Sequence, residues 1–591
     1  MSARSKPSLR CRWPSLLAGS LLIAALAYAQ DQGPEFPSGW IPKNALASKH
    51  DMVAAANPLA VEAGYKILRE GGNAVDAVVA IQTVLNLVEP QSSGIGGGAF
   101  ILFHNGRNGL LTTYDGRETA PAAAKPDRFL GSEGKPLRFF DAVIGGKSVG
   151  VPGTLRVLEL AHRQYGKLPW AQLFEPAIEL AERGFAVSPR LSLLIAGEKD
   201  RFLQDRARAY FLNADGSPRA VGQTLKNPAF AATLRRVAAE GADAFYKGSI
   251  AADIVETVGS PATNAGDMTE EDLASYKAKV REPVCGRYRA WRVCGMPPPS
   301  SGGITVLQIL GELEPFDLRA IGAESLMSVH LFSEAGRLAY ADRDRYLADP
   351  EFVVAPSGLT DPAYLRQRSA LIKLDASMGR ATAGVPPVTA NKKAARVDFG
   401  IDNAVEFPST SHICIVDRYG NALSMTTSIE WAFGSHLMTR GGFLLNNELT
   451  DFSFSPIDDG KPVANRVEPG KRPRSSMAPT IVYDDKDRVY VVAGSAGGPA
   501  IINDVAKALL GVLDWNLDPQ AAIDLPNIGS RNGPTELERN TPATTLEPKL
   551  RALGHETRLV IDTSGLSMIM RRNDGWIAGT DPRREGAAMG D

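Results

Sequence analysis

The chain has 591 residues, of which 44 % are hydrophobic and 22 % charged, and its formal net charge is −1. This is ordinary globular composition, and the length allows several domains. The near-zero net charge shows no footprint of nucleic-acid binding, so no nucleic acid is expected among the partners.

The N-terminal stretch has the pattern of an export signal. Four basic residues precede an apolar run over 16–26. Ala27-Tyr28-Ala29 then supplies small residues at the third and the last position before the expected cleavage site. This pattern predicts a secretory signal peptide over residues 1–29, cut after Ala29. The apolar run is short for a membrane span, and no later stretch could cross a bilayer. We therefore expect a soluble periplasmic or secreted protein without a membrane anchor.

Three cysteines remain after removal of this segment. A turn at Arg289-Ala290 would place Cys285 and Cys294 opposite each other in a hairpin. An oxidising compartment permits a disulfide there, although bridges across neighbouring strands can be strained, so both states stay open. Cys414 lies in an apolar run and is expected to be a small core residue.

The first elements are two helices and two strands. Asn57-Pro58 is a cap followed by proline at the first helical position, and apolar residues then recur at helical spacing up to Leu68. The next helix, 74–88, is apolar nearly all round and should be buried. A glycine-rich loop over 92–98 lacks the Gly-Lys-Ser/Thr of a phosphate-binding loop, so its glycines indicate close backbone packing. Strands are expected over 99–104 and 110–114.

Arg117 follows the second of these strands directly. An arginine in this position is either a clamp for a substrate carboxylate or part of a surface ion pair. The residues around it, taken alone, favour the ion pair.

Gly146-Lys147-Ser148-Val149-Gly150 matches the G-x-S-x-G elbow of serine α/β-hydrolases. That motif needs a strand before it and a helix immediately after it. Here 141–146 is a weak strand, and Pro152-Gly153 intervenes before the helix 154–165. The match is therefore interpreted as accidental, with a serine hydrolase using Ser148 kept as a remote alternative.

The middle of the chain is predicted to be mostly helical over 170–280, with further helices over 304–313 and 325–347. The last of these carries Glu334, Arg337, Asp342 and Arg343, interpreted as a solvated or ion-paired face. No His-x-x-x-His or paired-cysteine spacing occurs, so neither a metal nor another cofactor is expected.

The junction at Ser409-Thr410 stands out. A poorly structured run over 379–408 leads straight into the apolar strand Ser411–Val416, and an exposed loop of this kind is a natural place for a chain break. Cleavage between Ser409 and Thr410 would give Thr410 a hydroxyl nucleophile and its own α-amine as general base. The pKa of an α-amine is about 7.7–8.0, which suits proton transfer near neutral pH.

After Thr410 the pattern changes to strands, expected over 421–427, 442–446, 480–483 and 488–493, followed by a helix over 500–513. Helices before and strands after suggest two sheets between helical layers. Polar groups follow the strand ends: Ser428 and Glu430, then Glu448 and Asp451, then Ser475 and Ser476, then Gly497 and Gly498. Together with Thr410, these residues supply a nucleophile, carboxylates, hydroxyl donors and backbone N–H groups that can bind an oxyanion.

From about Ala47 to the C-terminus the sequence resembles the γ-glutamyltransferase family of the N-terminal-nucleophile hydrolase superfamily. The matching motifs, in chain order, are 57–60, 71–77, 93–98, Pro297-Pro298-Pro299-Ser300-Ser301-Gly302-Gly303, 338–343 and Gly470-Lys471-Arg472-Pro473-Arg474-Ser475-Ser476-Met477. The resemblance implies a four-layer αββα sandwich formed by one precursor that cuts itself into a large chain, 30–409, and a small chain, 410–591. The two chains would remain together as a heterodimer.

The resemblance also implies roles for the site residues. Thr410 is the nucleophile, Gly497 and Gly498 form the oxyanion hole, and Arg117, Ser475 and Ser476 hold the α-carboxylate of a γ-glutamyl group. Glu448 and Asp451, with Glu430 beside them, hold its α-amine. Arginine grips carboxylates bidentately, and carboxylates suit an ammonium, so the residue types agree with these roles. The implied donors are glutathione or other γ-glutamyl compounds, and the acceptors are water, amino acids or peptides.

Three departures from the family pattern bear on the substrate. Ser428 stands in place of a threonine that orients the nucleophile, and Glu430 stands where many members have asparagine. The segment between Asp451 and Ser475 is shorter than in members with a lid and lacks their gating tyrosine, which implies an open pocket. A glutaryl-type cephalosporin acylase is the alternative within the superfamily, and an inactive, uncut binding protein is an alternative of another class.

Overall fold

The computed structural model describes residues 39–387, 397–404, 406–407, 409–561 and 563–591. The predicted signal peptide lies outside the described residues. Within them, none of the helices combines the length and the apolar character that a membrane crossing needs.

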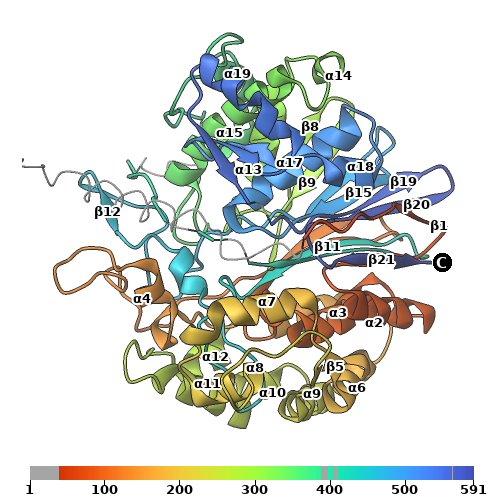
Figure 1. Cartoon of the computed structure of the whole chain (residues 1–591), viewed down its shortest axis with the longest axis vertical. Helices are drawn as coiled ribbons and strands as arrows, with labels where there is room; N and C mark the ends of the chain where they lie inside the picture. The colour runs from red at the N-terminus through yellow and green to blue at the C-terminus, as the bar shows by residue number, and fades with distance from the viewer. Residues whose placement is uncertain (1–38, 388–396, 405, 408, 562) are drawn as a thin grey trace, which may run out of the picture.

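Two seven-stranded antiparallel sheets lie face to face in the middle of the molecule (Figure 1). The first contains, in order, β1 (Leu46–Ser48), β20 (Gly575–Thr580), β19 (Ser567–Arg572), β15 (Val489–Gly494), β14 (Thr480–Tyr483), β9 (Trp291–Gly295) and β8 (Val284–Tyr288). The second contains β21 (Ala587–Gly590), β2 (Met52–Ala55), β10 (Ser411–Val416), β11 (Ala422–Ser428), β3 (Gly98–His104), β4 (Leu111–Gly116) and β7 (Lys279–Arg281).

Helices cover the outer face of each sheet, which makes the predicted αββα sandwich (Figure 1). The layer on the first sheet includes α13 (Gly302–Leu313), α15 (Leu326–Tyr346), α17 (Ile501–Leu513) and α18 (Pro519–Asp524). The layer on the second includes α2 (Pro58–Arg69), α3 (Ala74–Val88), α5 (Thr154–Tyr165), α6 (Glu175–Arg183), α7 (Pro189–Glu198) and α9 (Pro228–Glu240). Apolar side chains of both sheets, such as Cys414 and Val492, share the core between them.

The two N-terminal helices form for the local reasons that the sequence indicates. The Asn57 side chain accepts from the N–H of Leu59 at the start of α2. Asn73 and Asp76 make a reciprocal capping box at the start of α3, and every residue of α3 is buried. The prediction of a buried second helix is confirmed.

The hairpin β8–β9 pairs Cys285 directly with Cys294, and the two form a disulfide. Arg289, in the two-residue turn, has φ = 54°, which the tight turn requires. The structure therefore decides the pairing that the sequence left open.

Two local predictions are wrong, and of the two alternatives left open for a third, one is confirmed. Residues 442–446 form only an isolated bridge, Met438 to Leu444, because the N–H of Asn446 donates instead to the carbonyl of Gly96. The weak strand expected over 141–146 is the short helix α4 (Phe139–Val143) followed by the turn η1 (Gly146–Ser148). The polar face of α15 is ion-paired but not solvated, since Glu334, Arg337, Asp342 and Arg343 are all buried.

Thr410 immediately precedes β10, near the centre of the second sheet. β10 lies between β2 and β11, and Ser411 is opposite Thr427 in the register with β11. The start of β10 therefore lies beside the end of β11, where Ser428 and Glu430 emerge. The pairing of β10 with β11 thus brings the Ser409–Thr410 junction, Ser428 and Glu430 to one end of the sheet.

Candidate active site

The hydroxyl of Thr410 lies directly beside the carbonyl of the preceding peptide bond. Thr410 Oγ1 donates to the carbonyl oxygen of Ser409 and is 3.3 Å from Ser428 Oγ. Ser428 Oγ in turn donates to the same Ser409 oxygen at 3.1 Å. The nucleophile, the carbonyl that it would attack and a hydroxyl donor to that carbonyl are therefore assembled in the uncut chain.

This arrangement is fixed from several sides. The N–H of Glu430 donates to Ser428 Oγ at 2.9 Å, and Arg584 Nη1 donates to the carbonyl of Thr410 at 3.0 Å. A Cβ on Gly97 would lie 2.0 Å from the carbonyl oxygen of Ser428, so only glycine allows this approach. The close-packing interpretation of the glycine-rich loop is confirmed at this position.

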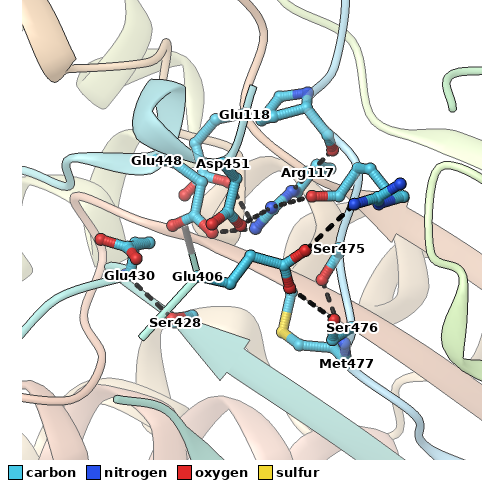
Figure 2. A network of polar contacts seen from close by, with 12 residues as sticks. Arg117, Glu118, Glu406, Ser428, Glu430, Glu448, Asp451, Ser475, Ser476 and Met477 are labelled. Carbon is cyan, nitrogen blue, oxygen red and sulfur yellow. Dashed lines mark hydrogen bonds and ion pairs between the residues drawn. The ribbon is translucent and has the colours of Figure 1, made fainter. Parts of the chain in front are cut away.

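Arg117 lies at the end of β4 in a buried ion cluster (Figure 2). Its Nη1 pairs with Glu448 and its Nη2 with Asp451, while Nε donates to the Pro473 carbonyl at 3.1 Å. The side chain is 1 % exposed. The interpretation of Arg117 as part of a surface ion pair is therefore wrong, because this pair is buried.

Acidic groups outnumber the guanidinium in this cluster. Glu118, Glu430, Glu448 and Asp451 face one arginine, Arg117. Burial raises the pKa of all four carboxyls, and for Asp451, where Glu448 adds to the effect and Arg117 opposes it, the pKa rises to about 8. Neighbouring acids add to the effect of burial: Asp451 and Glu448 raise the pKa of Glu430, and Glu448 raises the pKa of Asp451. An added ammonium would relieve this repulsion.

Three of these four carboxyls have buried oxygens that lack a hydrogen-bond partner among the described residues, and two of the three line the pocket. Among the described residues, Glu430 Oε1 and Glu448 Oε2 have no hydrogen-bond partner, and both residues line the pocket beside Thr410. Glu430 also has φ = 74°, a left-handed conformation that Glu adopts rarely and Asn more readily. Buried acceptors without partners are costly, so a cationic ligand would gain by reaching them.

Ser475 and Ser476 are held by the proline-rich turn before α13. Ser475 N–H donates to the Pro299 carbonyl at 3.0 Å, and Ser301 N–H donates to the Ser475 carbonyl at 2.7 Å. Both serines line the pocket with Thr410. Two motifs that are distant in the sequence therefore build one wall of the site.

Glu406, three residues before Ser409, places its carboxylate in this pocket. Arg343 Nη2 donates to Glu406 Oε1 at 2.6 Å, and Ser476 Oγ donates to Oε2 at 2.6 Å. Arg474 Nη2 is 3.3 Å from Oε1. Figure 2 shows Glu406 among the other pocket residues, with its carboxylate at Ser476.

Gly497 and Gly498 lie where the loop after β15 turns into η6 (Gly498–Ala500) and α17. Both have positive φ, 136° and 56°, and Gly498 lines the pocket. N–H groups at the start of a helix are suited to an anion. The structure thus brings together Thr410, Ser428, Glu430, Glu448, Asp451, Arg117, Ser475, Ser476 and Gly498 around one pocket, and Gly497 directly precedes Gly498.

Ser148 is not part of this site. It is fully buried in η1, with its hydroxyl 2.6 Å from the Val143 carbonyl and 3.0 Å from the Gly145 carbonyl. The element before it is α4 rather than a strand. The nucleophile-elbow alternative is therefore excluded by its structural context.

One group among the described residues has metal-ligand chemistry: His330, Glu334 and His555. His330 Nε2 is 2.7 Å from the Lys373 carbonyl, so Nδ1 accepts from His555 Nε2 at 2.7 Å. His555 Nδ1 then accepts from Thr535 Oγ1 at 2.8 Å. Every ring nitrogen of the two histidines therefore has a hydrogen-bond partner, and the cluster links α15 to the C-terminal segment as a structural contact.

Three residues near the pocket are not among the predicted site residues: Glu406 lines the pocket with Thr410, Arg474 is 3.3 Å from Glu406, and Arg584 donates to the Thr410 carbonyl. Arg343, predicted to lie on a solvated or ion-paired face, also contacts Glu406 and Ser476. Arg343 and Arg474 lie within the two matching motifs 338–343 and 470–477, which was the available signal. Glu406 had none, because its role depends on where the loop before Thr410 lies.

The comparisons with known proteins agree with this geometry. The family model described as gamma-glutamyltranspeptidase matches residues 60–591. The chain is 39 % identical over 558 residues to a glutathione hydrolase proenzyme of Bacillus subtilis (strain 168), covering 93 % of this chain and 92 % of that protein. It is 34 % identical over 548 residues to an acylase ACY 1 proenzyme of Pseudomonas sp. (strain V22), covering 91 % and 92 %.

The crystal structure of cephalosporin acylase from Bacillus halodurans is similar over 93 % of this chain and 97 % of that chain, with a TM-score of 0.81 and 27 % identity. The family match spans nearly the whole described chain and includes every residue gathered around Thr410. The chain therefore belongs to the γ-glutamyltranspeptidase family.

Proposed function

We propose that this protein is an exported, self-processing γ-glutamyltransferase and glutathione hydrolase. The observation that carries the substrate assignment is the buried cluster beside Thr410, in which one arginine and an excess of carboxylates face the pocket. An α-amino acid carries one carboxylate and one ammonium. Its carboxylate suits Arg117, Ser475 and Ser476, and its ammonium suits Glu430, Glu448 and Asp451.

Processing comes first. Thr410 Oγ attacks the Ser409 carbonyl carbon, and the oxyanion that forms accepts a hydrogen bond from Ser428 Oγ. The proton lost by the Thr410 hydroxyl is transferred to the Thr410 nitrogen as the C–N bond breaks, which leaves an ester between Ser409 and Thr410. Water hydrolyses this ester and yields the Ser409 carboxylate and a free Thr410 amine. The products are the large chain ending at Ser409 and the small chain starting at Thr410, held together by the shared core.

Turnover repeats the same chemistry on a ligand. The Thr410 amine takes the hydroxyl proton, and Oγ attacks the γ-amide carbonyl. The N–H groups of Gly497 and Gly498 stabilise the oxyanion. The leaving amine takes the proton, and water, an amino acid or a peptide then attacks the γ-glutamyl ester. No metal or cofactor enters these steps.

Export has independent support. Disulfides persist in oxidising compartments, and the pair Cys285–Cys294 fits the periplasmic or extracellular location that the N-terminal segment implies. The proenzyme names of the relatives favour processing in the same way.

The deciding experiment replaces Thr410 with Ala and follows the chain by gel electrophoresis, N-terminal sequencing and hydrolysis of γ-glutamyl-p-nitroanilide. We expect the wild type to give two chains, the small one starting at Thr410, and the variant to stay uncut and inactive. A small chain with another N-terminus, or cleavage of Thr410→Ala, would contradict the proposal.

A glutaryl-type acylase is the second candidate, favoured by the structural similarity to a cephalosporin acylase over nearly the full chain. A glutaryl group has the same carboxylate and chain length but no amine, so it would leave Glu430 and Glu448 without a cation. We expect kcat/KM for γ-glutamyl-p-nitroanilide to exceed that for glutaryl-p-nitroanilide by about 10-fold or more, because unpaired buried groups penalise such an analogue. A faster glutaryl substrate would favour the acylase.

A further inference from the structure

The connection between β20 and β21 brings a buried cation to Thr410. β20 belongs to the first sheet and β21 to the second, and Arg584 lies between them in the chain. Arg584 Nη1 donates to the Thr410 carbonyl at 3.0 Å, and Nε donates to the Thr563 carbonyl at 2.9 Å. The side chain is buried. A guanidinium from the C-terminal segment therefore contacts the residue that cleavage turns into a chain end.

Strand register explains why Arg584 reaches Thr410. Ala55 ends β2 and lies opposite Ile413 of β10 on one side and opposite Ala587 of β21 on the other. Both neighbouring strands run antiparallel to β2, so the residues that precede these partners lie beyond its end. Thr410 and Arg584 occupy equivalent positions, each three residues before the partner of Ala55. The Arg584 side chain therefore crosses the end of β2, where the pairing of β2 with β10 has stopped.

Other contacts hold the arginine in this place. Lys43 Nζ donates to the Arg584 carbonyl at 2.9 Å. A Cβ on Gly565 would lie 3.2 Å from Arg584 Cδ and Nε, so the side chain passes close to this glycine. The backbone groups of Gly565 and Ala496 exchange hydrogen bonds of 3.1 and 3.4 Å, and Ala496 directly precedes Gly497. Arg584 is thus packed against the loop that carries the oxyanion glycines.

The position of this charge matters for the α-amine that cleavage creates. A carbonyl oxygen lies no more than about 3.6 Å from the nitrogen of its own residue, so Arg584 Nη1 lies within about 7 Å of that amine. The amine must be unprotonated to take the proton of the Thr410 hydroxyl. A nearby cation destabilises the protonated amine and lowers its pKa. Arg584 therefore favours the form of the amine that acts as general base.

Most other charged groups in the pocket act in the opposite direction. Four carboxyls and one guanidinium line the pocket with Thr410, and ionised carboxylates raise the pKa of an amine beside them. Burial lowers the pKa of His412 to about 3, so this ring adds no charge near neutral pH. The charged groups around Thr410, Gly497 and Arg584 are Arg117, Glu430, Glu448, Asp451 and Glu406 with its partners Arg343 and Arg474 in the pocket, Glu89 and Arg190 beside Ser411, Asp504 beside Gly497, and Lys43, Asp581 and Arg583 in the C-terminal region.

We propose that Arg584 is a positioning residue of the nucleophile. It holds the Thr410 carbonyl beyond the end of β2, and its charge keeps the α-amine of cleaved Thr410 unprotonated near neutral pH. The proposal rests on the proposed function, since it concerns the N-terminal form of Thr410.

The test measures kcat/KM for γ-glutamyl-p-nitroanilide on cleaved enzyme from about pH 5 to pH 10, where the rise on the acid side reports the pKa of the general base. Arg584→Gln keeps an N–H donor but removes the charge, so we expect this rise to shift upward by about one pH unit or more. Arg584→Lys keeps the charge and should restore the wild-type profile. Lys43→Met is the matched control, because it loosens the same segment and leaves the guanidinium at Thr410 in place.

Two results would overturn the proposal. One is a fall of kcat/KM in Arg584→Gln by the same factor at every pH, which a purely structural contact would give. The other is an equal shift of the acid side in Lys43→Met.

A second measurement uses the wild type alone and decides if Arg584→Gln does not fold or cleave. Cyanate carbamylates only unprotonated amines, and mass spectrometry of the small chain reports the rate at Thr410 as a function of pH. We expect a midpoint below the ordinary α-amine value of about 7.7, and a midpoint at or above that value would overturn the proposal. A small chain that does not start at Thr410 would contradict the proposed function itself, whereas an unshifted profile of a correctly cleaved enzyme contradicts only the role of Arg584.

Discussion

Ser428 is the residue whose removal most directly tests the geometry at the cleavage point. Its Oγ is 3.1 Å from the Ser409 carbonyl oxygen and 3.3 Å from Thr410 Oγ1. Negative charge develops on that carbonyl oxygen as Thr410 attacks, so the Ser428 hydroxyl donates where the charge appears. Loss of one such donor costs roughly 10²–10³ in rate, or about 2.7–4 kcal/mol of barrier. Ser428→Ala should therefore slow self-cleavage by about that factor.

The assay is a cell-free translation time course in which the uncut and cut chains are separated on a gel. Ser428→Thr keeps the hydroxyl and should cleave close to the wild-type rate. Ser424→Ala is the matched control on the same strand. Ser424 Oγ donates to the Ala493 carbonyl at 2.9 Å and accepts from the Thr480 N–H at 3.2 Å, away from Thr410. Wild-type cleavage by Ser428→Ala, or equal slowing by Ser424→Ala, would refute the reasoning.

Two further predictions concern the pocket and the C-terminal segment. Arg117→Lys should raise KM for γ-glutamyl-p-nitroanilide more than it lowers kcat, because an ammonium cannot hold Glu448 and Asp451 as the guanidinium fork does; an unchanged KM would leave Arg117 without a binding role. Burial lowers the pKa of His555 to about 3, so between that pH and about 6.5 the unfolded state binds a proton that the folded state does not, and stability is lost as pH falls through this window. We expect the urea midpoint of the wild type to fall more than that of His555→Gln when the pH is lowered from 7 to 4. An equal fall in both proteins would contradict this assignment.

Elements governed by near neighbours were predictable from the sequence. The cap at Asn57, the buried helix after Asn73 and the strand Ser411–Val416 all form as expected. Their signals are capping side chains and apolar spacing, which act within a few residues. The expected strand over 442–446 failed because its backbone partner, Gly96, is distant in the sequence.

In the candidate site, too, the sequence predicted what depends on nearby residues and missed what depends on distant ones. Residue types at strand ends and the family motifs predicted nearly every group that lines the pocket, including Ser475, Ser476 and Asp451. They did not predict how those groups pair. Arg117 meets Glu448 and Asp451 across more than 300 residues of chain, so its surroundings are invisible in its own segment.

The sequence by itself determined the helical and strand segments around Thr410, the residue types of the pocket and the family, because these depend on local spacing and on motifs in a fixed order. The tertiary structure alone decided that Cys285 and Cys294 are bridged, that Ser148 is buried structure and that Glu406 lies against Arg343 and Ser476. These outcomes follow from strand register and from the order of strands in the two sheets. Both depend on how distant segments pack together, which no single stretch of the chain encodes.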